Sequence, residues 1–285
     1  MTYGYRNSVL TIGLAASFIS IVGFVVSLGF LLSTVWADSG SITQAFPGLP
    51  VHSWWLLYTD TSLSELEYLW NLGGLFLFLL IVMASCVILK RIYQRTASSE
   101  IFFFMFFLFS LTIEGLRTLN ALLILEGAPV FVGVMLSKVI HFARFFGLFS
   151  FLFASLYSIE VSNQKFRILI MTSFLISLAL TYVMPIDSSI LLSNFLYKLG
   201  DEKSTWFITL ILEISILANF LVAAFRKERR EFALLALAVL LILAGREFVF
   251  FMSVPVFIGS GLVLTIVGIW LFRNQVHTIY LWPQV

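Results

Sequence analysis

The stretch SKVIHFARFF, residues 137–146, decides how this chain is interpreted, because it carries three basic side chains inside an apolar segment. The surrounding run, from Val130 to Tyr157, is otherwise uncharged. About 20 apolar residues in a helix cross about 30 Å of hydrocarbon, so this run is long enough to span a membrane. Lys138, His141 and Arg144 recur every third residue and therefore share one face of such a helix.

The composition of the whole chain is that of an integral membrane protein. Of its 285 residues, 60% are hydrophobic and 11% are charged, and the mean hydropathy is +1.03. Soluble domains carry about 25% charged residues, so the soluble classes are excluded. The net charge of +2 is small and the bases are scattered, which excludes a nucleic-acid partner.

Eight apolar runs of membrane-spanning length follow one another. They are approximately Val9 to Trp36, Leu66 to Leu89, Ile101 to Leu125, Val130 to Tyr157, Ile168 to Met184, Thr205 to Phe225, Phe232 to Met252, and Val254 to Phe272. Only Ser253 and Pro255 separate the last two runs, and a proline suits the start of a new helix. We predict an all-α polytopic bundle of eight transmembrane helices, with residues 1–285 forming a single domain.

The first run also raises the question of a signal peptide. Cleavage near Ala37 would leave seven helices. A signal peptide has an apolar core of about 7 to 15 residues, and the first run is far longer, so we favour an uncleaved helix.

Basic residues indicate the orientation of the bundle. Eleven of the seventeen Lys and Arg residues fall in connectors on one side, and only Lys198 and Lys203 fall in those on the other. By the positive-inside rule, this split predicts that both termini lie in the cytoplasm and that the protein resides in the cytoplasmic or inner membrane.

Two connectors on the opposite side are long. The first, Ala37 to Glu65, contains FPGLPVHSWWLLY, in which Trp54, Trp55 and Tyr58 predict an interfacial aromatic anchor. The second, Ile186 to Ser204, combines apolar residues with a charged end and predicts a short amphipathic lid.

Polar residues within the runs are the candidates for a functional site, because ionisable side chains in a membrane mark sites by default. The candidate ligand-binding residues are Glu114, Arg117, Asn120, Lys138, His141, Arg144, Glu213, Arg246 and Glu247. In the third run, Glu114, Arg117 and Asn120 again recur every third residue. The connector to the fourth run is short, so we expect these two helices to be antiparallel neighbours with facing polar stripes.

These charges are expected to pair. A lone ionised side chain at the bilayer centre costs about 2.5 to 3.5 kcal/mol even on a lenient scale. The simplest pairs join Glu114 to Arg117 or Arg144, and join Glu213 and Glu247 to bases on neighbouring helices. Four bases against three acids leave one positive charge, which favours an anionic guest held by guanidinium groups.

We therefore predict binding or transport of an anionic or amphiphilic molecule, such as a lipid-linked phosphate or an organic acid, through a charged pocket in the outer half of the bundle. One alternative is a membrane enzyme that acts on a lipid-linked substrate, with Glu114 or His141 as general acid or base. Another is a non-catalytic subunit or sensor of a membrane complex. In a purely structural interpretation, the ion pairs only hold the helices together.

The remaining signals point away from catalysis. No phosphate loop, dinucleotide fingerprint, zinc motif or serine elbow is present. Lys138 is the sole lysine within a run and lies far from the last helix, which excludes a retinal pigment. His52 and His277 fall on opposite sides of the membrane and cannot pair. We predict no metal and no cofactor, leave catalytic residues unassigned, and expect the bilayer, an anionic lipid or organic acid, and a membrane-protein partner as contacts.

Small residues within the runs have a packing interpretation. The sequence GSG at residues 259–261, together with Gly13, Gly23 and Gly29, predicts places where helices approach closely. The single cysteine, Cys86, cannot form an intrachain disulfide and is interpreted as a packing residue.

Overall fold

The computed structural model describes residues 3–47, 49–50, 64–159, 166–251 and 254–281. Within these residues, eight helices are long and apolar enough to cross a membrane, which confirms the predicted all-α fold and its eight apolar segments. The third of them is formed by two helices in series. The spans are α1 (Tyr3–Thr34), α3 (Glu65–Thr96), α4 (Ser99–Thr112) with α5 (Leu116–Leu125), α6 (Val130–Ser158), α7 (Phe166–Val183), α8 (Glu202–Lys227), α9 (Arg230–Phe251) and α10 (Pro255–Leu281).

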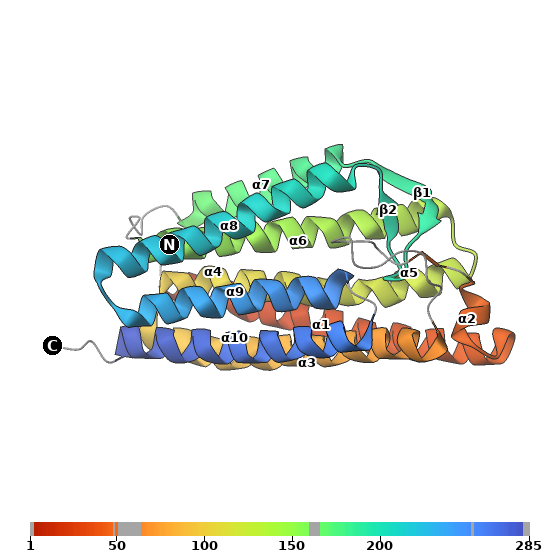
Figure 1. Ribbon diagram of the computed structural model, residues 1–285, viewed down its shortest axis with the longest axis horizontal. Coiled ribbons are helices and arrows are strands. Elements are labelled where there is room, and N and C mark those ends of the chain that lie inside the picture. The colour runs from red at the N-terminus through yellow and green to blue at the C-terminus, as the bar shows by residue number, and fades with distance from the viewer. Residues whose placement is uncertain (1–2, 48, 51–63, 160–165, 252–253, 282–285) are drawn as a thin grey trace.

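Short elements lie between the spans or, in the case of the 3₁₀ turn, inside the third span. They are a π-helical turn (Val35–Ser39), α2 (Ile42–Ala45), a 3₁₀ turn (Ile113–Gly115), β1 (Ile186–Leu191) and β2 (Tyr197–Leu199). In Figure 1, α2 and the two strands lie at one end of the bundle and the C-terminus lies at the other. The predicted aromatic anchor of Trp54, Trp55 and Tyr58 falls outside the described residues.

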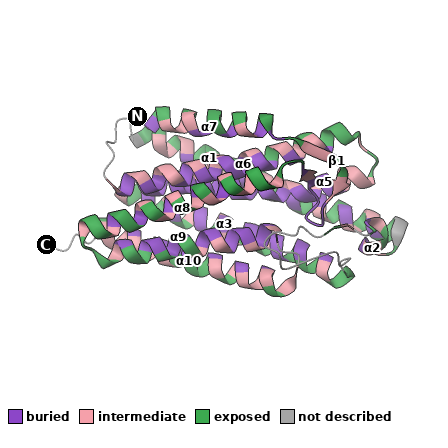
Figure 2. Cartoon of the chain, turned by 45° about the horizontal axis from the view of Figure 1, so that its top comes forward, coloured by how far each residue is buried: buried purple, intermediate pink, exposed green. Residues whose placement is uncertain are grey.

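The centre of the bundle is α4, which contacts α1, α3 and α6. Its sequence, SEIFFFMFFLFSLT, is apolar all round, as expected of a helix surrounded by others. Ser98 caps the start of the helix, because its side chain accepts a hydrogen bond from the Ile101 N–H. The ring of Phe104 stacks on Phe272 of α10, with centroids 4.0 Å apart. In Figure 2 the outer helices α7 and α8 expose one face, which is the surface available to lipid.

The connector between α7 and α8 is an antiparallel β-hairpin rather than an amphipathic lid, with Asp187 of β1 opposite Lys198 of β2. Its tip, residues 192–196, is buried against the end of the bundle. Phe195 adopts a left-handed conformation, φ 61°, and its carbonyl accepts a 2.6 Å hydrogen bond from Nδ2 of Asn120. Asn120 therefore fastens the hairpin to α5.

Two glycines bring α9 and α10 into close contact. A Cβ atom on Gly261 would lie 2.9 Å from the carbonyl oxygen of Gly245, and one on Gly245 would lie 2.7 Å from that of Gly261. These short distances agree with the prediction from sequence that helices approach closely at Gly261. The same prediction is wrong for Gly259, Gly23 and Gly29, where an added Cβ would have nothing within 4 Å.

We expect Gly261→Ala to lower the free energy of unfolding by about 1–3 kcal/mol, because the backbones must separate to admit the methyl group. Gly259→Ala, two residues away on the same helix, is the matched control and should be neutral or slightly stabilising, since alanine is the better helix former. Denaturation of both variants in detergent measures the difference. Equal stability of the two variants would contradict the proposed close contact.

Candidate functional site

Six ionisable side chains from four spans meet inside the bundle and form what we call the charged layer. They are Glu114 and Arg117 of the third span, Arg144 of α6, Glu213 of α8, and Arg246 and Glu247 of α9. All are buried except Glu213, whose side chain is 15% exposed. The layer holds as many acids as bases.

Glu114 is the hub of the charged layer. It lies in the 3₁₀ turn that separates α4 from α5 and is fully buried. Three guanidinium groups approach its carboxylate: Arg117 Nη2 at 3.8 Å, Arg144 Nη1 at 3.9 Å and Arg246 Nε at 4.0 Å. A 3₁₀ turn inside a helix often marks a functional hinge. The turn thus places one acid within reach of three bases from three spans.

Among the described residues, the shortest ion pair joins α6 to α9. Arg144 Nη2 donates to both carboxylate oxygens of Glu247, each at 2.9 Å. Glu247 Oε1 also lies 3.5 Å from Arg246 Nη1. The Arg144 guanidinium stands 3.4 Å over the ring of Phe250, a cation–π arrangement that is stronger where water is excluded.

Phe250 also supports Arg117. The Arg117 guanidinium lies 4.9 Å from the Phe250 ring centroid, and its Nη1 donates to the Phe250 carbonyl at 3.4 Å. Arg117 Nε donates to the carbonyl of Glu114 at 3.3 Å. The sequence interpretation missed Phe250, although the sequence REFVFF places it about one helical turn after two charged residues.

Several polar atoms of the layer have no hydrogen-bond partner among the described residues. The donors are Arg117 Nη2, Arg144 Nη1 and Arg246 Nε, Nη1 and Nη2, and the acceptors are Glu114 Oε1 and Oε2 and Glu213 Oε1. A buried polar atom left unpaired costs about 1–3 kcal/mol. The layer thus offers hydrogen-bonding capacity to a polar guest, and its free donors outnumber its free acceptors.

Lys138 lies outside the charged layer, which corrects the expectation of a fourth base. Its side chain is half-buried, and Nζ donates to the carbonyl of Tyr182 near the end of α7 at 3.2 Å. The long, flexible side chain reaches a free helix-end carbonyl instead of an acid. The layer therefore has no surplus positive charge, and the argument for an anionic guest from net charge does not hold.

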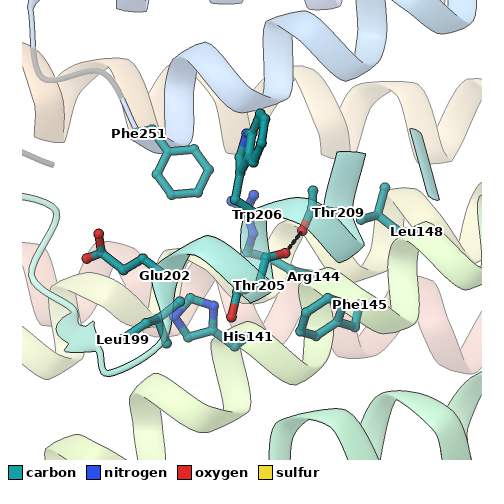
Figure 3. Close-up of a pocket in the computed structure, with 10 residues that line it drawn as sticks. All are labelled: His141, Arg144, Phe145, Leu148, Leu199, Glu202, Thr205, Trp206, Thr209 and Phe251. Atoms are coloured by element: carbon teal, nitrogen blue, oxygen red, sulfur yellow. Dashed lines mark hydrogen bonds between the residues drawn. The ribbon is translucent and has the colours of Figure 1, made fainter. Parts of the chain in front are cut away.

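His141 and Arg144 line a small cavity between α6 and α8. Its volume is about 30 Å³, enough for about one water molecule. Figure 3 shows His141 and Arg144 beside Thr205 and Trp206 of α8. The sequence interpretation did not include Thr205 or Trp206 among the site residues. The predicted residue Asn120 is not in this cavity, because it holds the hairpin.

A larger cleft lies between α8 and α9. Its volume is about 260 Å³, and it is lined mainly by leucine and isoleucine side chains, with Glu213 and Glu247 as its acids. Ile214 and Leu240, on its two sides, are exposed and would face lipid. The cleft therefore joins the membrane-facing surface to the charged layer.

No group of three or more His, Cys, Asp and Glu side chains is arranged to hold a metal ion in the part of the chain that the structure describes. A scan against protein-family models and searches of curated proteins and of solved structures find no match to this chain. The function must therefore be inferred from the site itself.

Proposed function

We propose that this multi-pass membrane protein binds an amphiphilic molecule with an anionic, oxygen-rich head group, which enters from the bilayer through the cleft between α8 and α9. One observation carries the proposal: the two acids of the cleft lie within 4.0 Å of Arg246, whose three guanidinium nitrogens all lack a hydrogen-bond partner among the described residues. Guanidinium groups are strong donors to carboxylate and phosphate oxygens. Free donors, rather than surplus charge, favour the anionic head group.

Charge balance decides how such a head group is accommodated. Because the layer is neutral, an added anion must displace an acid or arrive with a proton. Glu213 is the acid most easily displaced, since it is the most exposed and lies 4.0 Å from its partner Arg246. Once displaced, its carboxylate would face hydrocarbon without a cation, which is costly. Proton uptake by Glu213 removes this cost, so we infer that one proton binds with each anion.

Thermal unfolding of the full chain in an uncharged detergent tests this proposal, with dodecanoate as the probe and dodecanol as its matched uncharged control. Dodecanoate should raise Tm as its concentration increases, because a ligand that binds only the folded state stabilises it by mass action. Its affinity should rise about tenfold for each unit fall in pH, above the range in which dodecanoate itself is protonated. Glu213→Gln should bind dodecanoate without this pH dependence. An equal response to dodecanol would refute the anionic head group.

A second pair of variants tests the route of entry without changing any charge. Ala244→Phe places a ring in the cleft and should abolish the dodecanoate response. Ala233→Phe is the control, because Ala233 is exposed on α9 and does not line the cleft. A response of Ala244→Phe equal to that of the parent would rule out entry between α8 and α9.

We further propose that both termini lie in the cytoplasm and that the hairpin end faces outward. The support is the uneven distribution of connector bases, with eleven on the side of the termini. The basic end of the bundle would then meet the cytoplasmic leaflet.

Introduced cysteines report this orientation. Ser188→Cys in the hairpin and Arg229→Cys between α8 and α9 both replace exposed side chains, and the native Cys86 is fully buried. We expect an impermeant thiol reagent to label Ser188→Cys in intact cells and to label Arg229→Cys only after permeabilisation. The reverse pattern would invert the topology.

A further inference from the structure

A second site lies at the end of the bundle opposite the hairpin, in a groove between α3 and α10. Two helices each contribute a pair of basic side chains four residues apart, so each pair shares one face of its helix. The groove has a volume of about 240 Å³. It is lined by Ile88, Arg91, Ile92, Arg95, Arg273 and His277.

The groove is basic, and the residues that the structure describes do not neutralise it. Among the described residues, no ion pair joins any of its three arginines to a carboxylate. This differs from the charged layer, in which every guanidinium lies within 4.0 Å of an acid. Three like charges converging on one groove repel one another, and an anion placed among them would relieve that repulsion.

The position of Arg273 was not expected from the sequence. The predicted last span ends at Phe272, which would place Arg273 in a tail outside the bundle. In the structure α10 continues to Leu281, and this extension brings Arg273 and His277 opposite the arginines of α3.

We propose that this groove binds the phosphate of an anionic membrane lipid. Arg91 and Arg95 are exposed and lie one turn apart, where their guanidinium forks can donate to phosphate oxygens. Ile88 lies one turn deeper on α3 and is 38% exposed, so the groove opens onto the hydrocarbon-facing surface. Basic pockets between transmembrane helices are suited to lipid head groups. Continuity with the apolar surface selects a lipid over a soluble phosphate.

Native mass spectrometry of the full chain in detergent tests this site, with phosphatidylglycerol as the probe and phosphatidylcholine of the same acyl chains as the zwitterionic control. The parent should retain phosphatidylglycerol in preference. Arg95→Gln with Arg273→Gln should weaken its retention about 30-fold, and Arg273→Gln alone about fivefold. Arg273 is exposed, so the single variant is expected to fold even if the double variant does not.

The matched control is Arg226→Gln with Arg229→Gln, which removes two exposed bases outside the groove. It should retain phosphatidylglycerol like the parent. Equal losses in the two double variants would overturn the proposal, because general electrostatic attraction would then explain retention. Displacement of phosphatidylglycerol by inorganic phosphate at equal concentration would overturn the lipid assignment. Neither result depends on the dodecanoate response, because no residue of the groove belongs to the charged layer.

Discussion

Replacing Glu114 by glutamine is expected to lower the free energy of unfolding by about 3–5 kcal/mol, because it leaves a buried charge without its partner. Glu114 is fully buried and is the only acid within 4.0 Å of Arg117 among the described residues. Its loss leaves three bases against two acids in a buried site. Denaturation in detergent, followed by tryptophan fluorescence, measures the change. Glu228→Gln is the control, because Glu228 is exposed at the end of α8 and should change stability little.

The companion variant restores the balance of the layer. Glu114→Gln combined with Arg117→Met removes one acid and one base, and we expect it to be more stable than Glu114→Gln alone. Neighbouring charges are not additive, so the second substitution should recover part of the loss. If the double variant is instead less stable by the sum of both losses, the hydrogen bonds of Arg117 to Phe250 and Glu114 matter more than its charge.

The spans could be predicted from sequence because length and hydropathy belong to each segment alone. The division before Pro255 falls where a proline can begin a helix, as expected. The ends were harder to place: α3 continues to Thr96 and α10 to Leu281. A helix that leaves the hydrocarbon can continue in polar sequence, so the end of an apolar run underestimates its length.

The charged layer could be predicted only in part. Spacing and the short connector correctly place Glu114 near Arg117 and Arg144. Spacing assigns a residue to a helix face but does not say which neighbour that face meets. Lys138 shares the stripe of Arg144, yet it reaches α7 instead of an acid. The pairing of Glu247 with Arg144 depends on the order of helices around the bundle, which no local pattern carries.

The hairpin could not be predicted for a related reason. The strand residues IDSSIL do not alternate between apolar and polar, and YKL is too short for its alternation to predict a strand. The left-handed conformation at Phe195 is stabilised by Asn120, 75 residues away in sequence. Tertiary contact, rather than local propensity, selects the strand conformation here.

The second large effect is expected at the pair Arg144 and Glu247. Either Arg144→Met or Glu247→Met alone should cost about 3–5 kcal/mol, because each leaves the other charge buried without its closest partner. The variant with both substitutions keeps the layer balanced and fills the space with apolar side chains. Replacing a whole buried ion pair in this way is often neutral or stabilising, so we expect the double variant to unfold close to the parent. A double-mutant cycle from denaturation in detergent gives the coupling energy.

This cycle also separates the two interpretations of the charged layer. If the double variant is as stable as the parent, the ion pair is not needed to hold α6 against α9. The free energy spent on burying its two charges then brings no gain in stability and calls for a functional explanation. Binding of a polar head group is then the better explanation for so many buried charges. If the double variant is instead about as unstable as either single variant, the intact pair stabilises the contact between the two helices more than apolar side chains do. The layer would then be structural, and the case for a ligand would rest on the cleft and on the donors without a hydrogen-bond partner on Arg117 and Arg246.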